Sequence, residues 1–198
     1  MNDSDEPLLI EILEATAIIR FNRPAKRNSL STQLMDRLEQ ALLQLLPRDE
    51  LLSVIFTGAD NVFASGADIR ELAALNAATA VDFAKRGQAI FNRIANARQR
   101  TIAAINGYCM GGALDLALSC DVRIASVNAV FAHPGANLGI ITGWGGTQRL
   151  PRLIGQARAL EFFLTAKRID SREALEIGLV NEICDPVLER ALQLLPSS

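Results

Sequence analysis

The residues best suited to chemistry lie within residues 106–117, where the adjacent glycines Gly111 and Gly112 are followed by Asp115. An apolar run over residues 101–105 predicts a strand before this stretch, and the alanine-rich segment after it predicts a helix. Glycines at the junction permit a tight turn and leave the first helical amides without a shielding Cβ. These amides, at the positive end of the helix dipole, favour a developing negative oxygen. Such amides beside a carboxylate indicate enolate chemistry.

The elements that must position this stretch alternate between strands and helices. We expect a hairpin over residues 8–14 and 15–21, and strands over residues 52–57, 101–105, 121–125 and 130–132. Ser31 can cap an amphipathic helix, and further helices are expected over residues 68–75, 78–97, 112–120, 157–166 and 171–176, after residues 143–146, and from near Val187. Strands that alternate with helices at this spacing predict an α/β fold with a largely parallel sheet flanked by helices.

Composition argues against several classes of partner. The chain has 198 residues, which suits a single domain over residues 1–198, and a net charge of −2, which does not favour a nucleic-acid partner. No apolar run approaches the roughly 20 residues of a membrane span, so no membrane insertion is expected. The acidic start over residues 1–6 differs from a secretory signal and favours a cytoplasmic location.

The metal-ligating residue types are few. The three cysteines are odd in number and have apolar neighbours, which indicates buried thiols in a reducing compartment. One histidine and no paired-cysteine spacing argue against a metal site.

Five sequence blocks together resemble the crotonase superfamily, the enoyl-CoA hydratase/isomerase family. They lie at residues 22–30, 63–72, 107–117, 143–151 and 164–180, and the resemblance extends from about Ile12 to Val187. One block alone would be weak support, whereas five in the family's order are specific.

The resemblance implies roles for particular residues. In this family two backbone amides hold the thioester oxygen of an acyl-CoA, and the matching positions are Ala67 and Gly112. The positions that match the family's CoA-contacting segments are Ala25, Lys26, Ser65, Ala67, Asp68, Ile69 and Arg70. No cofactor is implied beyond the coenzyme A of the substrate.

The family fold is a β-β-α spiral core, assembled as trimers or pairs of trimers. Family members continue through further helices that cover the acyl pocket and reach a neighbouring subunit. We therefore expect residues 1–198 to form the core domain with this C-terminal lid and trimerisation segment missing, and the uncovered apolar surface to promote association.

The sequence departs from the family at the acids. Hydratases of the family use two glutamates, but the first matches Asp115, which is one methylene shorter, and the second matches Gly135. An additional acid of some isomerases matches Gly143. Three activities stay open: a hydratase, an isomerase that uses Asp115 as its one acid, and a decarboxylase that needs no base. A non-catalytic acyl-CoA-binding protein is a fourth alternative.

Simpler interpretations apply to several of these residues. A carboxylate in a first helical turn, such as Asp115, is often a partner of the helix dipole. His133, the single histidine, is more often structural in such a context, and Tyr108 and Trp144 are expected to pack with satisfied polar tips. Ser65 lacks the Gly-x-Ser-x-Gly pattern of a hydrolase nucleophile.

Overall fold

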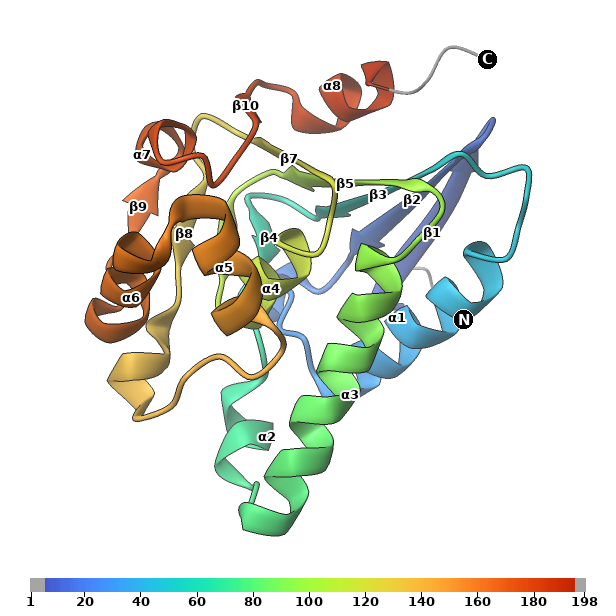
Figure 1. Ribbon diagram of the computed structural model, residues 1–198. Coiled ribbons are helices and arrows are strands. Elements are labelled where there is room, and N and C mark those ends of the chain that lie inside the picture. The colour runs from blue at the N-terminus through green and yellow to red at the C-terminus, as the bar shows by residue number, and fades with distance from the viewer. Residues whose placement is uncertain (1–5, 195–198) are drawn as a thin grey trace.

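The computed structural model describes residues 6–194 and contains a larger and a smaller β-sheet (Figure 1). The first five residues of the acidic start and residues 195–198 of the C-terminal tail lie outside the described residues. The larger sheet has the order β1 (Leu8–Leu13), β2 (Thr16–Phe21), β3 (Ser53–Gly58), β5 (Arg100–Ile105), β7 (Val122–Ala125) and β10 (Glu182–Ile183). Only the β1–β2 pair in this sheet is antiparallel. The predicted hairpin and the largely parallel α/β sheet are confirmed.

Of the smaller sheet, the sequence predicted only the strand over residues 130–132. It has the order β4 (Val62–Ala64), β6 (Tyr108–Met110), β8 (Val130–Ala132) and β9 (Ile169–Asp170). Three of its strands follow directly on strands of the larger sheet, as β3–β4, β5–β6 and β7–β8, so the chain winds as a spiral that crosses both sheets. The apolar run at residues 101–105 therefore leads first into β6 and only then into the glycine-rich helix.

Helices cover both faces of the larger sheet. Their bounds are α1 (Thr32–Leu45), α2 (Ile69–Ala73), α3 (Ala77–Ala95), α4 (Gly112–Ala117), α5 (Gly146–Ile154), α6 (Gln156–Thr165), α7 (Ser171–Glu176) and α8 (Val187–Gln193), with 3₁₀ turns η2 (Pro24–Lys26) and η3 (Pro134–Leu138). Side chains such as Ile19 and Phe56 share one core with α1 and α3, whereas Ile18, Ile55 and Ile102 pack toward α8. Because these strands are buried on both faces, their sequences are continuous apolar runs.

Helix α1 begins where the sequence predicts. The side chain of Ser31 accepts a hydrogen bond from the Leu34 amide, at 3.4 Å, and so satisfies one unpaired donor of the first turn. The predicted apolar face of α1, which includes Leu38 and Leu42, is buried.

Two asparagines fix the corners where the chain passes between the sheets. The side chain of Asn28 donates to the carbonyl oxygens of Val62 at 2.8 Å and Phe63 at 3.3 Å, and its Oδ1 accepts from the Arg23 amide at 2.7 Å. At the next corner, the side chain of Asn106 accepts a hydrogen bond from the Gly58 amide and donates one to the carbonyl oxygen of Asp60. These bonds hold successive turns of the spiral at a fixed spacing.

No helix within residues 6–194 is long and apolar enough to cross a membrane. Within the same residues, no group of three or more His, Cys, Asp or Glu side chains is arranged to hold a metal ion.

The substitution Asn28→Ala is expected to lower the free energy of unfolding by about 2–4 kcal/mol. It leaves buried carbonyl oxygens without donors and places alanine at a φ of 50°, a left-handed conformation that favours asparagine and glycine. Chemical denaturation measures the change. The exposed Asn128→Ala is the matched control and is expected to change stability by less than about 0.5 kcal/mol. Equal effects of the two substitutions would contradict the assigned role of Asn28.

Candidate active site

Two backbone amides without acceptors meet at one cavity. Ala67 follows β4 and Gly112 opens α4, and both residues line the same cavity of about 490 Å³. Among the hydrogen bonds of residues 6–194, none uses either amide as a donor. An idealised Cβ on Gly112 would lie 3.5 Å from the Ala67 amide nitrogen, which places the two donors within reach of one ligand atom. The structure thus brings together the pair of residues that the resemblance implies.

Close backbone contact makes this arrangement possible. Gly66 has a φ of 87°, and a Cβ on it would lie 2.6 Å from the Met110 carbonyl oxygen and 3.0 Å from the Gly112 nitrogen. Any side chain at this position would push the loop after β4 away from the turn before α4. The loop is fixed from its other side by a 2.8 Å hydrogen bond from the Leu30 amide to the Gly66 carbonyl oxygen.

Trp144 covers the start of α4. A Cβ on Gly112 would lie 2.5 Å from the indole ring, so the ring lies directly against the glycine. The indole Nε1 donates to the Phe83 carbonyl oxygen at 3.3 Å, and the ring packs against the side chains of Phe83 and Phe91. The expectation of a packed tryptophan with a satisfied polar tip is confirmed. The same expectation is wrong for Tyr108, which is 43% exposed.

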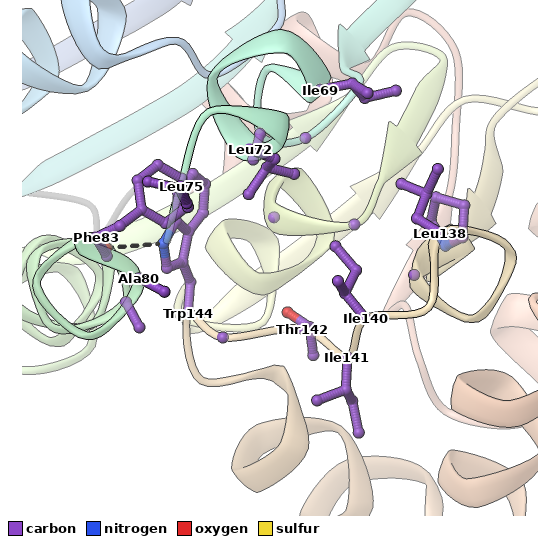
Figure 2. A pocket seen from close by; sticks show the side chains of 18 of the residues that line it. Ile69, Leu72, Leu75, Ala80, Phe83, Leu138, Ile140, Ile141, Thr142 and Trp144 are labelled. Carbon is purple, nitrogen blue, oxygen red and sulfur yellow. Dashed lines mark hydrogen bonds between the residues drawn. The ribbon is translucent and has the colours of Figure 1, made fainter. Parts of the chain in front are cut away.

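The cavity wall is largely apolar (Figure 2). Helices α2 and α3 and the segment between them contribute Leu72, Leu75, Ala77, Ala80, Phe83 and Ala84, and the segment after β8 contributes Leu138, Ile140 and Ile141. The polar side chains on the wall are Ser65, Asn76, His133 and Thr142, with Trp144 turning its apolar ring to the cavity. No Asp, Glu, Lys or Arg of the described chain lines it. This wall suits an uncharged hydrocarbon group.

Asp115 lies behind this wall. Its side chain is fully buried, it does not line the cavity, and its Oδ2 accepts a hydrogen bond from the Thr142 hydroxyl. Burial raises the pKa of Asp115 to about 6, although the hydrogen bond from Thr142 and the nearby Gly146 and Trp144 amides oppose the rise. The role of Asp115 as a base stays a prediction. The structure adds that this carboxylate has no exposed surface.

His133 lies beside Asp115. Its Nε2 is 3.5 Å from Asp115 Oδ1, and neither this oxygen nor either imidazole nitrogen has a hydrogen-bond partner among the described residues. The imidazole also packs against the ring of Phe163, with centroids 5.2 Å apart. Burial lowers the pKa of His133 to about 4, so the imidazole is neutral at pH 7.

The residues expected to contact CoA divide into two groups. Ser65, Ala67 and Ile69 line the cavity, whereas Ala25, Lys26, Asp68 and Arg70 do not. Ala25, Lys26 and Arg70 are exposed.

Hydrogen bonds fix the positions of the two segments that contain these residues. The loop that contains Ala25 and Lys26 lies next to Ser65, whose amide donates to the Arg27 carbonyl oxygen at 3.0 Å. Asp68 caps α2 by accepting from the Arg70 amide at 2.9 Å, which is a structural role in its own right.

The two glycines that the resemblance matches to family acids, Gly135 and Gly143, differ in their surroundings. A Cβ on Gly135 would lie 2.6 Å from the Ile140 carbonyl oxygen, so a side chain there requires the loop to move. A Cβ on Gly143 would meet only the Ala84 methyl, at 3.6 Å, which is an ordinary contact. Position 135 is therefore closed to a side chain, whereas position 143 is open.

Sequence reasoning missed Thr142 and did not connect His133 with Asp115. Thr142 is 27 positions from Asp115, and no periodic pattern links residues so far apart. The one available signal was a hydroxyl residue at the end of the apolar run Ile140, Ile141 and directly before Gly143.

Comparisons with known proteins identify the family. Residues 11–196 match the family described as enoyl-CoA hydratase/isomerase. A short-chain-enoyl-CoA hydratase of Clostridium acetobutylicum is 39% identical over 180 residues, which cover 90% of this chain and 69% of the relative. A crotonyl-CoA hydratase of Syntrophomonas wolfei is 39% identical over 182 residues, covering 91% of this chain and 70% of the relative.

Solved structures give the same result. An enoyl-CoA hydratase from Bacillus anthracis superposes with a TM-score of 0.90 at 36% identity, covering 96% of this chain and 75% of that chain. DspI from Pseudomonas aeruginosa superposes with a TM-score of 0.91 at 36% identity, covering 98% of this chain and 80% of that chain. This chain belongs to the enoyl-CoA hydratase/isomerase family of the crotonase superfamily.

The opposite pKa shifts of Asp115 and His133 predict opposite pH dependences of stability. The folded pKa of Asp115 is raised, so its contribution to stability is lost as pH rises from about 4 to 6. The folded pKa of His133 is lowered, so its contribution is lost as pH falls from about 6.5 to 4. Between pH 4 and 6 the two effects oppose each other in the parent protein.

Removing either group is expected to reveal the pH dependence of stability that the other group contributes. Relative to the parent, Asp115→Asn gains stability and His133→Gln loses stability as pH rises from 4 to 6, each by about 2–3 kcal/mol. Urea denaturation at several pH values measures these differences, in which the titration of all other groups cancels. Changes of the same sign in both variants would show that the two shifts are wrongly assigned.

Proposed function

We propose that this chain is an acyl-CoA enzyme of the hydratase/isomerase type that stabilises the enolate of a thioester at the amides of Ala67 and Gly112. The single observation that carries the proposal is the pair of unpaired amides at one apolar cavity. The family relationship supports the acyl-CoA class of substrate. No cofactor is part of the proposal beyond the coenzyme A of the substrate.

The amides would act on the developing charge. A thioester makes its α-proton only weakly acidic, so most of the barrier lies in placing negative charge on the carbonyl oxygen. Two fixed donors in a largely apolar cavity stabilise that oxygen without reorganisation, and they act more strongly there than in water. The ring of Trp144 against Gly112 excludes water from one side of the donors.

The cavity wall supports an enoyl group as the reacting chain. With no cationic side chain of residues 6–194 on the wall, a second carboxylate of a malonyl-type substrate would be buried without a partner, at a large desolvation cost. This disfavours the decarboxylase alternative. The exposed loop of Ala25 and Lys26 and the exposed Arg70 are where we expect the nucleotide end of CoA to lie.

Within the hydratase/isomerase type, isomerisation is the reaction that a specific observation favours. Hydration in this family uses two carboxylates, whereas position 135 is closed to a side chain and the cavity has only the buried Asp115 behind its wall. Moving one proton along a chain requires a single acid–base group. The homotrimeric or hexameric assembly and the cytoplasmic location stay predictions.

A panel of three thioesters tests the proposed function. The protein is incubated with crotonyl-CoA, a 3-enoyl-CoA and methylmalonyl-CoA while ultraviolet absorbance and product mass are recorded. We expect turnover of the 3-enoyl-CoA, slower or no hydration of crotonyl-CoA, and no loss of carbon dioxide from methylmalonyl-CoA. Tight binding of all three without turnover would support a non-catalytic acyl-CoA-binding protein in place of an enzyme.

A pair of substitutions at Gly112 isolates the amide donor. Gly112→Pro and Gly112→Ala both place a Cβ against Trp144, but only proline removes the N–H. Gly112→Pro is expected to lower kcat by a further factor of roughly 10²–10³ relative to Gly112→Ala. Steady-state kinetics on the best substrate of the panel gives the ratio. Equal rates in the two variants would contradict an oxyanion role for this amide.

A further inference from the structure

The carboxylate of Asp115 is separated from the cavity by the side chain of Thr142. Asp115 has no exposed surface, whereas Thr142 lines the cavity and its hydroxyl donates a hydrogen bond to Asp115 Oδ2. Figure 2 shows Thr142 on the wall between Trp144 and Ile140, in the segment that precedes α5. Any proton that moves between Asp115 and a bound substrate has to cross this position.

His133 does not offer an alternative route. It lines the cavity, but neither imidazole nitrogen has exposed surface, and Nε2 is 3.5 Å from Asp115 Oδ1. The imidazole nitrogens are therefore not accessible from the cavity. Ser65 and Asn76, the other polar side chains on the wall besides Thr142, make no hydrogen bond to Asp115.

We propose that the Thr142 hydroxyl passes one proton between the substrate's α-carbon and Asp115, so that Asp115 acts on the substrate only through Thr142. This inference rests on the proposed function. A hydroxyl has one donor and two acceptor lone pairs, and its donor is already directed at Asp115. Its lone pairs are therefore free to accept a proton from the cavity side.

The step balances without a co-reactant. The α-carbon–hydrogen bond of a 3-enoyl thioester breaks as Thr142 Oγ1 takes the proton, and the proton that Oγ1 held passes to Asp115 Oδ2. The electron pair moves onto the thioester oxygen at the Ala67 and Gly112 amides. Reversal of the transfer delivers the proton to the γ-carbon, which gives the 2-enoyl thioester and restores both side chains.

The proposal also explains how an aspartate can serve at this position. Asp115 is one methylene shorter than the glutamate that the resemblance implies, and it is buried instead of facing the cavity. The hydroxyl of Thr142 spans the remaining gap. Thr142 is then the catalytic residue, and Asp115 is the group that receives its proton.

The charged and titratable groups around Asp115 permit a pH test. His133 approaches Oδ1, Arg149 on α5 lowers the pKa of Asp115 through its charge, and the Cys109 thiol on β6 interacts electrostatically with Asp115. Arg149 and Cys109 keep their protonation between pH 4 and 7, because the pKa of buried Cys109 lies well above 9.0 and an arginine stays charged. Of these four groups, Asp115 and His133 are the ones that titrate in that range.

Four variants test the proposal by steady-state kinetics. Thr142→Val keeps the side-chain shape but lacks the hydroxyl, and it is expected to lower kcat by about 10²–10³-fold with KM changed by less than about threefold. Thr142→Ser restores the hydroxyl and is expected to recover kcat to within about tenfold of the parent. Asp115→Asn and the double variant Thr142→Val/Asp115→Asn are expected to match Thr142→Val, since each interrupts the same transfer.

The pH profile separates a proton carrier from a packing residue. In the parent, kcat is expected to rise with pH through about 6, as Asp115 becomes the carboxylate, and Thr142→Val is expected to lose this rise. Thr147→Val, on the first turn of α5 and outside the cavity wall, is the matched control and is expected to keep the parental kcat and profile.

The outcomes distinguish two failures. A parent protein that turns over no thioester of the panel would overturn the proposed function itself. An active parent whose Thr142→Val variant keeps more than a third of kcat would overturn this inference alone. So would a double variant whose loss equals the product of the two single losses, because independent action of the two residues predicts that product.

Discussion

The contact between the loop at Gly66 and the turn at Gly111 and Gly112 is the constraint on which the rest of the site depends. A Cβ on Gly66 would approach the Met110 carbonyl oxygen to 2.6 Å, so the two backbones meet at a distance that only glycine allows. The side-chain hydrogen bonds of Asn28 and Asn106 at the corners of the spiral hold both segments at this spacing. The first amide of α4 and the Ala67 amide are thereby left unpaired at one cavity.

Burial determines the electrostatics around this contact. The cavity has no charged side chain from residues 6–194 on its wall, and Asp115 and His133 lie within or behind that wall with raised and lowered pKa values respectively. Both shifts follow from desolvation, which disfavours the charged form of each group. Burial keeps the imidazole of His133 neutral at pH 7, so the two groups do not form an ion pair, and it leaves Asp115 able to exchange a proton near neutral pH.

The departures from the family have structural consequences that differ by position. At Gly135, which the resemblance matches to the second acid, the Ile140 carbonyl oxygen occupies the space that a Cβ would take. At Gly143 the space is open. In our proposal Asp115 is the one acid of the site, and Thr142, which donates a hydrogen bond to it from the cavity wall, connects it with the substrate.

The sequence by itself determined the longer elements, because their patterns are local. The hairpin over residues 8–21 and the helix capped by Ser31 follow from apolar periodicity and capping. Local pattern did not predict strands β4 and β6, because each has three residues and forms by pairing with segments distant in the sequence, β4 with β6 and β6 also with β8. The family blocks identified Ala67 and Gly112, but only the tertiary structure placed Thr142 and His133 against Asp115. Burial and long-range contacts determine which residues become neighbours of Asp115, and the local spacing of residues in the sequence predicts neither.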